Sequence, residues 1–298
     1  MQSRLSRDAY FAIARECRAQ HIRFVGHVPG TVSAFEAADA GQASIEHLTG
    51  VLLATSTKED ELRREQLAPG PPNESAEAAL ARSRAWQRKL LDSFSQQKAE
   101  ALIQKFASQR TWQVPTFPVL VHTGFLTPQT DLQNDPRSKY LASQLRQIWD
   151  QGRKQSLEHR TEEDFGLRQE IVKRSLEIVG EMNAAGSPIM AGTDAAAPNV
   201  FPGFSLHEDL EFLVQAGLTP MQALQAATSR SAEFLGRSGE QGIIIVGQRA
   251  DLVLLDANPL LNIRNTRQVR AVILNGKLLE RRDLDALLGS AARFAASH

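Results

Sequence analysis

This 298-residue chain has few of the features that would tie it to a membrane, an oxidising compartment or a nucleic acid. It has a single cysteine, Cys17, so an internal disulfide cannot hold the fold. No apolar run is long enough to span a bilayer, and the first ten residues do not read as a signal peptide. Thirty-four basic residues balance 34 acidic ones, which argues against nucleic-acid binding. As written, the sequence predicts a cytoplasmic protein.

A glycine-rich phosphate loop is also missing, so a nucleotide-binding fold is not indicated. What is present is an alternation of helices and short buried strands. Residues 6–20 predict a helix, and "IRFVGH" a strand; "TVSAFEAADAG" predicts a second helix ended by Gly41, and "ASIEHL" a second strand. A third strand is expected over Gln113–Phe117, and a fourth, "SPIMAGTD", ends on Asp194. This order predicts a parallel sheet of the α/β class.

The pattern divides the chain into two parts. Residues 1–237 form the α/β part, with a long polar helical insertion at about 50–110 that is interrupted by "PGPPNES". Residues 238–298 are β-rich, in "GIIIVGQRADLVLLDANPL" and "VRAVILNGKLLE", and Asn275-Gly276 is a hairpin signal. We therefore expect a small β-segment after the larger unit.

Polar side chains stand at the carboxyl ends of three of the expected strands: His27, His47 and Asp194. In a parallel barrel these ends converge on one face, where imidazole and carboxylate together suit zinc and similar divalent ions. Each residue alone has an ordinary structural interpretation, since most single histidines are structural and an Asp after Gly-Thr is often a helix cap. Three such residues at the carboxyl ends of three strands favour a metal site.

Several segments together resemble the amidohydrolase superfamily. They are "GHVPG", "IEHL", "VPTF", "GTDA", "LHEDLEFLVQAGLTPMQALQAATSRSAEFLG" and "GIIIVGQRADLVLLDANPLLNIRNTRQVRAVILNGKLL". The chain is most similar to the imidazolonepropionase-like and Xaa-Pro-dipeptidase-like branch, over nearly its whole length apart from the helical insertion. The resemblance implies a metal-dependent hydrolase on a (β/α)8 TIM-type barrel beside a composite β-sandwich.

The resemblance also implies roles for particular residues. The family's metal ligands are a His-x-His pair on the first strand, a carboxylated lysine or glutamate on the fourth, histidines on the fifth and sixth, and an aspartate on the eighth. His27 and His47 match the fifth- and sixth-strand histidines, and Asp194 matches the aspartate, which binds metal and acts as general base. His207 and His122 are candidate substrate contacts, although each also reads as an ordinary helix-surface or loop histidine.

One part of the family pattern is missing. The sequence contains no His-x-His pair, and no strand precedes the helix at Ser6. The resemblance is therefore to strands five to eight of the barrel and the closing β-segment, with the lysine-bearing strand expected just upstream of Met1. Such a chain would leave the sheet edges open. Three explanations stand side by side: an N-terminally truncated form, pairing of two copies, or a complementing second chain.

These observations predict a metal-dependent amidohydrolase that cleaves a C–N bond in an amide, cyclic amide or dipeptide by metal-activated water. The expected cofactor is a divalent metal, zinc in particular, with one site at most complete in this chain. The alternative is a catalytically impaired remnant that acts as an assembly or interaction subunit. The missing His-x-His pair favours the remnant, and the retained His27, His47 and Asp194 favour the enzyme.

Overall fold

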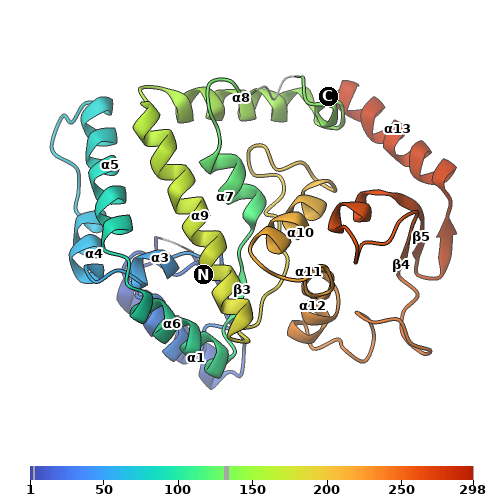
Figure 1. Ribbon diagram of the computed structural model, residues 1–298, viewed down its shortest axis with the longest axis horizontal. Helices are drawn as coiled ribbons and strands as arrows, with labels where there is room; N and C mark the ends of the chain where they lie inside the picture. Colours follow the sequence, from blue (N-terminus) through green and yellow to red (C-terminus); the bar gives the residue numbers. More distant parts are fainter. Residues whose placement is uncertain (3, 131–133, 298) are drawn as a thin grey trace.

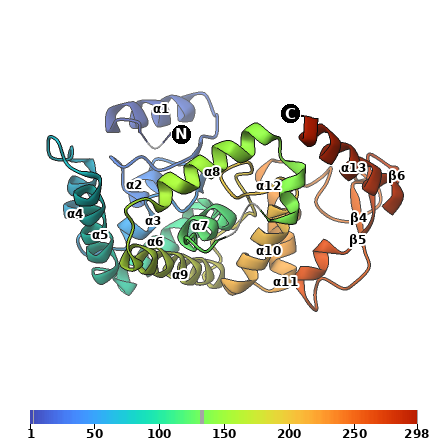
Figure 2. The ribbon, with the colours of Figure 1, turned by 90° about the horizontal axis from the view of Figure 1, so that it is seen from above.

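The computed structural model describes residues 1–298 except residues 3, 131–133 and 298. Helices make up most of the chain and surround a small parallel sheet (Figure 1). A second, antiparallel sheet lies at the opposite end of the molecule from α4 (Glu59–Leu67) and α5 (Ala76–Asp92), as Figure 2 also shows. This mixed content agrees with the expected α/β class.

The parallel sheet has three short strands, in the order β1 (Val25–Gly26), β2 (Ser44–Glu46) and β3 (Trp112–Val114). Ile45, at the centre of β2, pairs with both neighbouring strands. Among the described residues, the sheet continues beyond β3 as a single parallel bridge to Ile189. Because these segments all run the same way, their carboxyl ends lie at one edge of the sheet.

The third and fourth strands are shorter than the sequence predicts. The third, expected over residues 113–117, ends before Pro115, which has no N–H to donate to a ladder. Thr116 then adopts a left-handed conformation with φ of 49°, which turns the chain into a helix. The fourth, expected to end on Asp194, contributes only the bridge at Ile189.

The helices that alternate with these strands begin at capping side chains. Ser6 precedes α1 (Arg7–Ala19), and its hydroxyl accepts a hydrogen bond from a backbone N–H of the first turn. At α2 (Ala34–Asp39), Ser33 and Glu36 form a reciprocal capping box. Both helices agree with the prediction from the sequence.

Between β2 and β3 the chain is mostly helical, as predicted for residues 50–110. The helices are α3 (Val51–Ala54), α4, α5 and α6 (Gln96–Gln109), and the "PGPPNES" break separates α4 from α5. The Trp86 indole of α5 donates to the backbone oxygen of Leu62 in α4, at 2.9 Å. Helix α6 packs against α2, so the end of this stretch belongs to the main core.

The second half of the chain continues with helices that cover the sheet. α9 (Glu162–Ala184) crosses α10 (Ser205–Gln215) so closely that a Cβ on Gly180 would lie 2.2 Å from the backbone oxygen of Ala216. The remaining elements are α7 (Phe117–Gly124), η1 (Pro136–Tyr140), α8 (Ser143–Leu157), α11 (Pro220–Ala227) and α12 (Ser229–Phe234).

One large hydrophobic core lies between the sheet and these helices. Its fully buried side chains include Tyr10, Ile45, Phe106, Met182 and Leu213. Each large apolar side chain removed from water contributes about 1.5–3 kcal/mol. The edge of the sheet that carries the candidate residues is therefore supported by a packed hydrophobic core.

The C-terminal part contains an antiparallel sheet of β4 (Leu252–Leu255), β5 (Val269–Leu274) and β6 (Lys277–Leu279). Asn275 and Gly276 join β5 to β6 with φ values of 50° and 78°, the positive values that a two-residue hairpin turn requires. The predicted hairpin is confirmed. The helix η2 (Ile263–Arg267) packs on α10 and ties this part to the rest of the chain.

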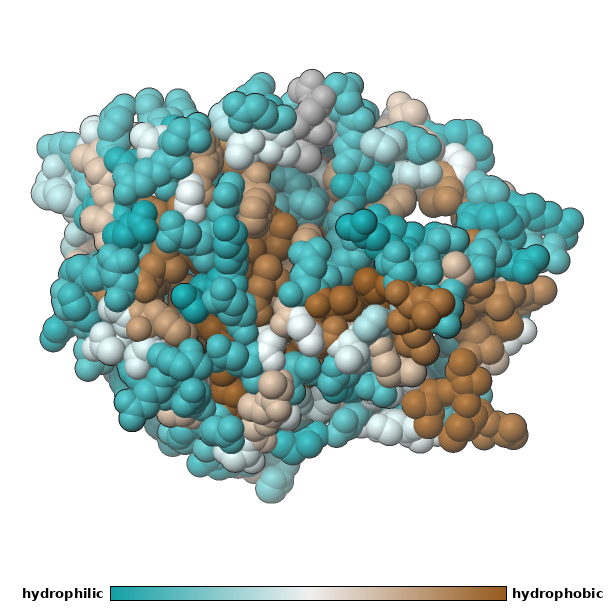
Figure 3. All heavy atoms as spheres, viewed as in Figure 1, coloured by the Kyte–Doolittle hydropathy of each residue, from teal (hydrophilic) through white to brown (hydrophobic). Residues whose placement is uncertain are grey.

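Two features of this part were not expected. The "GIIIV" stretch forms no strand, and Ile244 and Val246 are 84% and 104% exposed. Figure 3 shows a hydrophobic patch at the corner of the molecule that holds the segment after α12. The chain then closes with the helix α13 (Arg281–Ser297). The division of the chain after residue 237 stays a prediction.

No helix in the described part of the chain has both the length and the apolar character needed to cross a bilayer.

Candidate functional site

His27 and His47 lie side by side at the edge of the parallel sheet. His27 directly follows β1 and His47 directly follows β2, so the pairing of these strands brings the two histidines together. Their ring centroids are 4.8 Å apart, and the planes meet edge to face at 74°. The expectation that these strand ends converge agrees with this geometry.

The His47 ring is oriented by Thr116, which follows β3. Its Nδ1 lies 2.5 Å from the Thr116 hydroxyl oxygen. That hydroxyl donates its only proton to the backbone oxygen of Pro115, at 2.7 Å. With that hydroxyl proton donated to Pro115, we infer that the Nδ1–H of His47 donates to Thr116, which leaves a lone pair on Nε2 of the neutral ring.

Asp194 faces this free nitrogen. Its Oδ2 lies 4.0 Å from Nε2 of His47, and its side chain is 52% exposed. The backbone there is left-handed, with φ of 53°, and the carbonyl accepts a hydrogen bond from Ala197 in a turn. A separation of 4.0 Å is too long for a direct hydrogen bond. It is short enough for both groups to contact one bound atom.

His27 is held more deeply. Its Nδ1 is buried and has no hydrogen-bond partner. Burial lowers the pKa of His27, and the neighbouring His47 lowers it further, while Glu46 and Asp194 act in the opposite direction. The ring is therefore neutral at neutral pH, which is the form that binds a metal.

Glu46 was not singled out from the sequence, although it directly precedes His47. It accepts a hydrogen bond from the Ser44 hydroxyl at 2.5 Å. Its charge also favours the protonated form of His27. The position of Glu46 next to His47 in "IEHL" could have indicated a role near the site, but a glutamate at a strand end is usually a solvated residue.

The two histidines predicted to contact substrate have partners in other parts of the fold. The Nδ1 of His207, in α10, lies 3.0 Å from the hydroxyl oxygen of Thr266 in η2. Burial lowers the pKa of His207, and Arg267 adds to this effect. His122 lies in α7, where a loop was the expected setting, and its Nε2 is 3.0 Å from Glu208. Their roles in substrate binding stay predictions.

Glu208 is the centre of a partly buried ionic cluster. Besides His122, it accepts a hydrogen bond from Arg137 of η1. Arg137 also forms an ion pair of 2.7 Å with Asp135, and its guanidinium lies 4.2 Å from the centroid of the Phe201 ring. The cluster joins α7, η1, α10 and the segment that follows Asp194.

The next residue, Asp209, is fully buried. Its two carboxyl oxygens accept hydrogen bonds from the backbone N–H groups of Phe117, at 3.1 Å, and Gly192, at 3.0 Å. Burial raises the pKa of Asp209 to about 8, although both N–H groups favour the ionised form. No pattern in the sequence indicated this role, because "LHEDLEFL" is typical of a surface helix with a charged face.

The side chains at the sheet edge are of the types that bind metal ions. Nδ1 of His27 is buried without a partner, Nε2 of His47 has a free lone pair, and the Asp194 carboxylate faces it. These are donors that zinc takes in proteins. Within the described residues, however, no group of three His, Cys, Asp or Glu side chains is close enough together to hold an ion. The site is therefore an open arrangement of donors.

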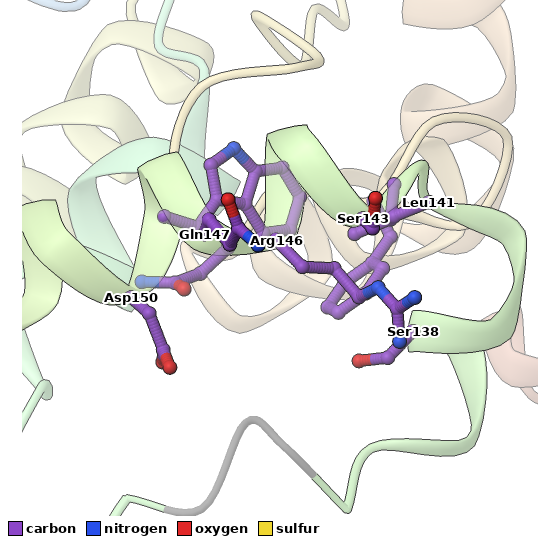
Figure 4. Close-up of a pocket in the computed structure, with 9 residues that line it drawn as sticks. Ser138, Leu141, Ser143, Arg146, Gln147 and Asp150 are labelled. Atoms are coloured by element: carbon purple, nitrogen blue, oxygen red, sulfur yellow. The ribbon is translucent and has the colours of Figure 1, made fainter. Parts of the chain in front are cut away.

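A cavity of about 380 Å³ lies beside the segment that follows Asp194. It is bounded by α8, by the residues around η1, and by Asn199 and Phe201. In Figure 4 the Arg146 side chain extends toward Ser138, and Asp150 lies on the opposite side. This volume is in the range of small-molecule pockets.

Residues 142–279, which include Asp194, match the amidohydrolase family. Just under half of the chain therefore resembles the amidohydrolase superfamily in sequence. It is 36% identical over 111 residues to adenine deaminase 2 of Agrobacterium fabrum, an alignment that covers 35% of this chain and 18% of that protein. It is 41% identical over 68 residues to imidazolonepropionase of Rubrobacter xylanophilus, which covers 21% of this chain and 16% of that protein.

Two solved structures share the fold over almost all of this chain. A bottromycin amidohydrolase superposes with a TM-score of 0.70 and 21% identity, over 98% of this chain and 57% of that one. A prolidase complexed with N-methylphosphonate-L-proline gives a TM-score of 0.55 and 19% identity, over 93% and 50%. The chain thus spans about half the length of these structures.

Proposed function

We propose that this chain carries the half of an amidohydrolase active site that barrel strands five to eight supply. It would take part in the hydrolysis of a C–N bond in a small amide, cyclic amide or dipeptide. The observation that carries the proposal is the orientation of His47, whose free Nε2 faces Asp194 beside the His27 ring. The names imidazolonepropionase and prolidase support the cyclic-amide and dipeptide classes, and the name adenine deaminase supports only the cleavage of a C–N bond.

In this proposal β1, β2, β3 and the Ile189 segment correspond to strands five to eight of the barrel. The pairing at the outer edge of β1 supports the assignment. The Met1 ammonium donates to the backbone oxygen of Val25, and the Met1 carbonyl accepts from the N–H of His27 at 3.2 Å. This is the pattern of one more parallel strand, at the place where the fourth barrel strand would end.

His27 and His47 would hold a divalent metal, with zinc the expected ion, and Asp194 would complete its contacts within this chain. The ion, when bound, supplies Lewis-acid activation of water. The half-exposed Asp194 carboxylate accepts the proton that the attacking water gives up. The neutral His27 remains a nitrogen donor at neutral pH because burial lowers its pKa.

The remaining ligands of a family metal pair would come from a segment or second copy placed along the β1 edge. A second candidate function, an assembly or interaction subunit without activity, has its own observation. The described residues contain no complete three-ligand group, and the Ile243–Val246 stretch is exposed. Exposed apolar patches of this kind mark interaction surfaces.

The test is zinc content per chain, measured by elemental analysis after purification with zinc. We expect close to one zinc per wild-type chain and loss of that zinc when His27, His47 and Asp194 are all changed to alanine. His159→Ala is the matched control, because that histidine is exposed and pairs with Glu77 away from the site. Equal zinc in all three proteins would contradict the proposed site. Zinc binding without hydrolysis of cyclic amides and prolyl dipeptides would favour the second function.

A further inference from the structure

The segments that carry His47's partner and Asp194 share one anchor. Phe117 directly follows Thr116, which orients His47, and Gly192 lies two residues before Asp194. The backbone N–H groups of Phe117 and Gly192 both donate to the same carboxyl group, that of Asp209. Each oxygen of Asp209 therefore holds one of the two segments.

Both segments need such an anchor because they leave the sheet in strained conformations. Thr116 and Asp194 have φ values of 49° and 53°, a region that disfavours residues with a Cβ. The strand ladder ends at Val114 and at the Ile189 bridge, so it provides no acceptor for the N–H groups of Phe117 and Gly192. A buried N–H without an acceptor would be costly, and Asp209 supplies the acceptor in both cases.

The fit around Gly192 is close. A Cβ at this position would lie 2.5 Å from Cγ1 of Val114 in β3. The chain entering Asp194 thus runs directly against the strand that leads to Thr116. A displacement of the Gly192 backbone would be transmitted to both sides of the site, since neither segment has room to move independently.

We propose that Asp209 is a positioning residue that sets the relative placement of His47 and Asp194. It touches neither side chain and acts through the backbone at Phe117 and Gly192. Nothing in the sequence pattern or in the family match assigns it this role. The inference rests on the proposed metal function only where zinc affinity is measured, because the orientation of His47 can be measured without metal.

Asp209→Asn is the informative variant. The amide keeps nearly the same shape, but it has one acceptor oxygen, so its NH2 group faces one of the two backbone donors. The matched control is Asp164→Asn. Asp164 is also buried, bonds Thr161 and Arg84, and contacts neither segment of the site.

The first readout is the ¹⁵N NMR signature of the His47 ring in metal-free protein. In the wild type and in Asp164→Asn we expect a single tautomer with the proton on Nδ1. In Asp209→Asn we expect a mixture of tautomers, and faster hydrogen exchange of the amides around Thr116 and Asp194. An unchanged His47 signature in Asp209→Asn would overturn the proposal.

The second readout is zinc affinity, measured by competition with a chelator. Loss of a residue that orients metal ligands typically costs about 10–100-fold in affinity, and we expect that loss in Asp209→Asn alone. Wild-type protein that binds no zinc would contradict the proposed function, while the His47 signature would still decide the role of Asp209. Equal zinc affinity of the wild type and Asp209→Asn would overturn the positioning role.

A measurement on wild-type protein covers the case in which Asp209→Asn does not fold. If one carboxyl holds both amides, the opening that releases Phe117 also releases Gly192. Their hydrogen-exchange protection factors should then agree within about threefold. Protection factors that differ by about a hundredfold or more would overturn the shared anchor.

Discussion

The hydroxyl of Thr116 lies 2.5 Å from Nδ1 of His47 and fixes which nitrogen of that ring faces Asp194. Two strands contribute to this contact, because His47 follows β2 and Thr116 follows β3. The strand ladder continues into it, since the His47 N–H donates to the backbone oxygen of Val114 at 2.9 Å. The ring that would donate to a metal is thus oriented by the neighbouring strand.

Removing that hydroxyl should weaken metal binding while leaving the fold intact. Thr116→Val keeps the β-branched shape but cannot accept the Nδ1–H, so we expect zinc affinity to fall about tenfold. Thr116→Ser keeps the hydroxyl and should bind zinc like the wild type. Titration against a fluorescent zinc chelator measures both, and equal affinities of the valine and serine variants would contradict the role of the hydroxyl.

The buried carboxyl of Asp209 predicts a pH dependence of stability with a definite sign. Its pKa is raised to about 8, above the ordinary value of 3.8. The contribution of this carboxyl to the free energy of unfolding is therefore fully present below about pH 4 and is lost as the pH rises toward 8. Compared with Asp209→Asn, the wild type should lose about 1 kcal/mol or more of unfolding free energy between these limits. Urea denaturation at several pH values measures this difference, and a constant difference would contradict it.

The exposed stretch after α12 should promote self-association. Ile244 and Val246 are 84% and 104% exposed, so changing both to lysine removes no packing. We expect less association in sedimentation velocity, with the free energy of unfolding changed by less than about 0.5 kcal/mol. The matched control adds the same charges nearby, as Ser238→Lys with Gln241→Lys. If the control reduces association equally, charge rather than the apolar patch is responsible.

The centre of the parallel sheet should be sensitive to loss of volume. Ile45 is fully buried and pairs with strands on both sides, so Ile45→Ala should cost about 2–5 kcal/mol of unfolding free energy. Ile148→Ala, at a position 54% exposed, should change it by less than about 0.5 kcal/mol. Chemical denaturation of both variants provides the comparison.

The sequence predicted the features that depend on local pattern or on strand direction. The hairpin at Asn275-Gly276 follows from backbone preferences of two residues, and the approach of His27 to His47 follows from the parallel order of their strands. The early end of the third strand is also local, since Pro115 cannot donate to a ladder, but the prediction extended the strand to Phe117.

The features that depend on burial by distant segments were not predictable in the same way. Asp209 is an ionisable residue in a helix with many charged residues, and only the packing of α10 shows that it is fully enclosed. His207 and His122 were singled out for their residue type, and their nearest partners, Thr266 and Glu208, lie far away in the sequence.

Three consecutive residues of one turn of α10 reach three different parts of the molecule. His207 contacts η2, Glu208 contacts α7 and η1, and Asp209 holds the two segments at the sheet edge. Neighbouring residues on an α-helix point about 100° apart, so this single turn contacts three parts of the structure. A substitution would break the contact with one of them. The insertion of a single residue into the preceding turn would rotate all three away together, so this turn should tolerate changes of residue type far better than changes of length.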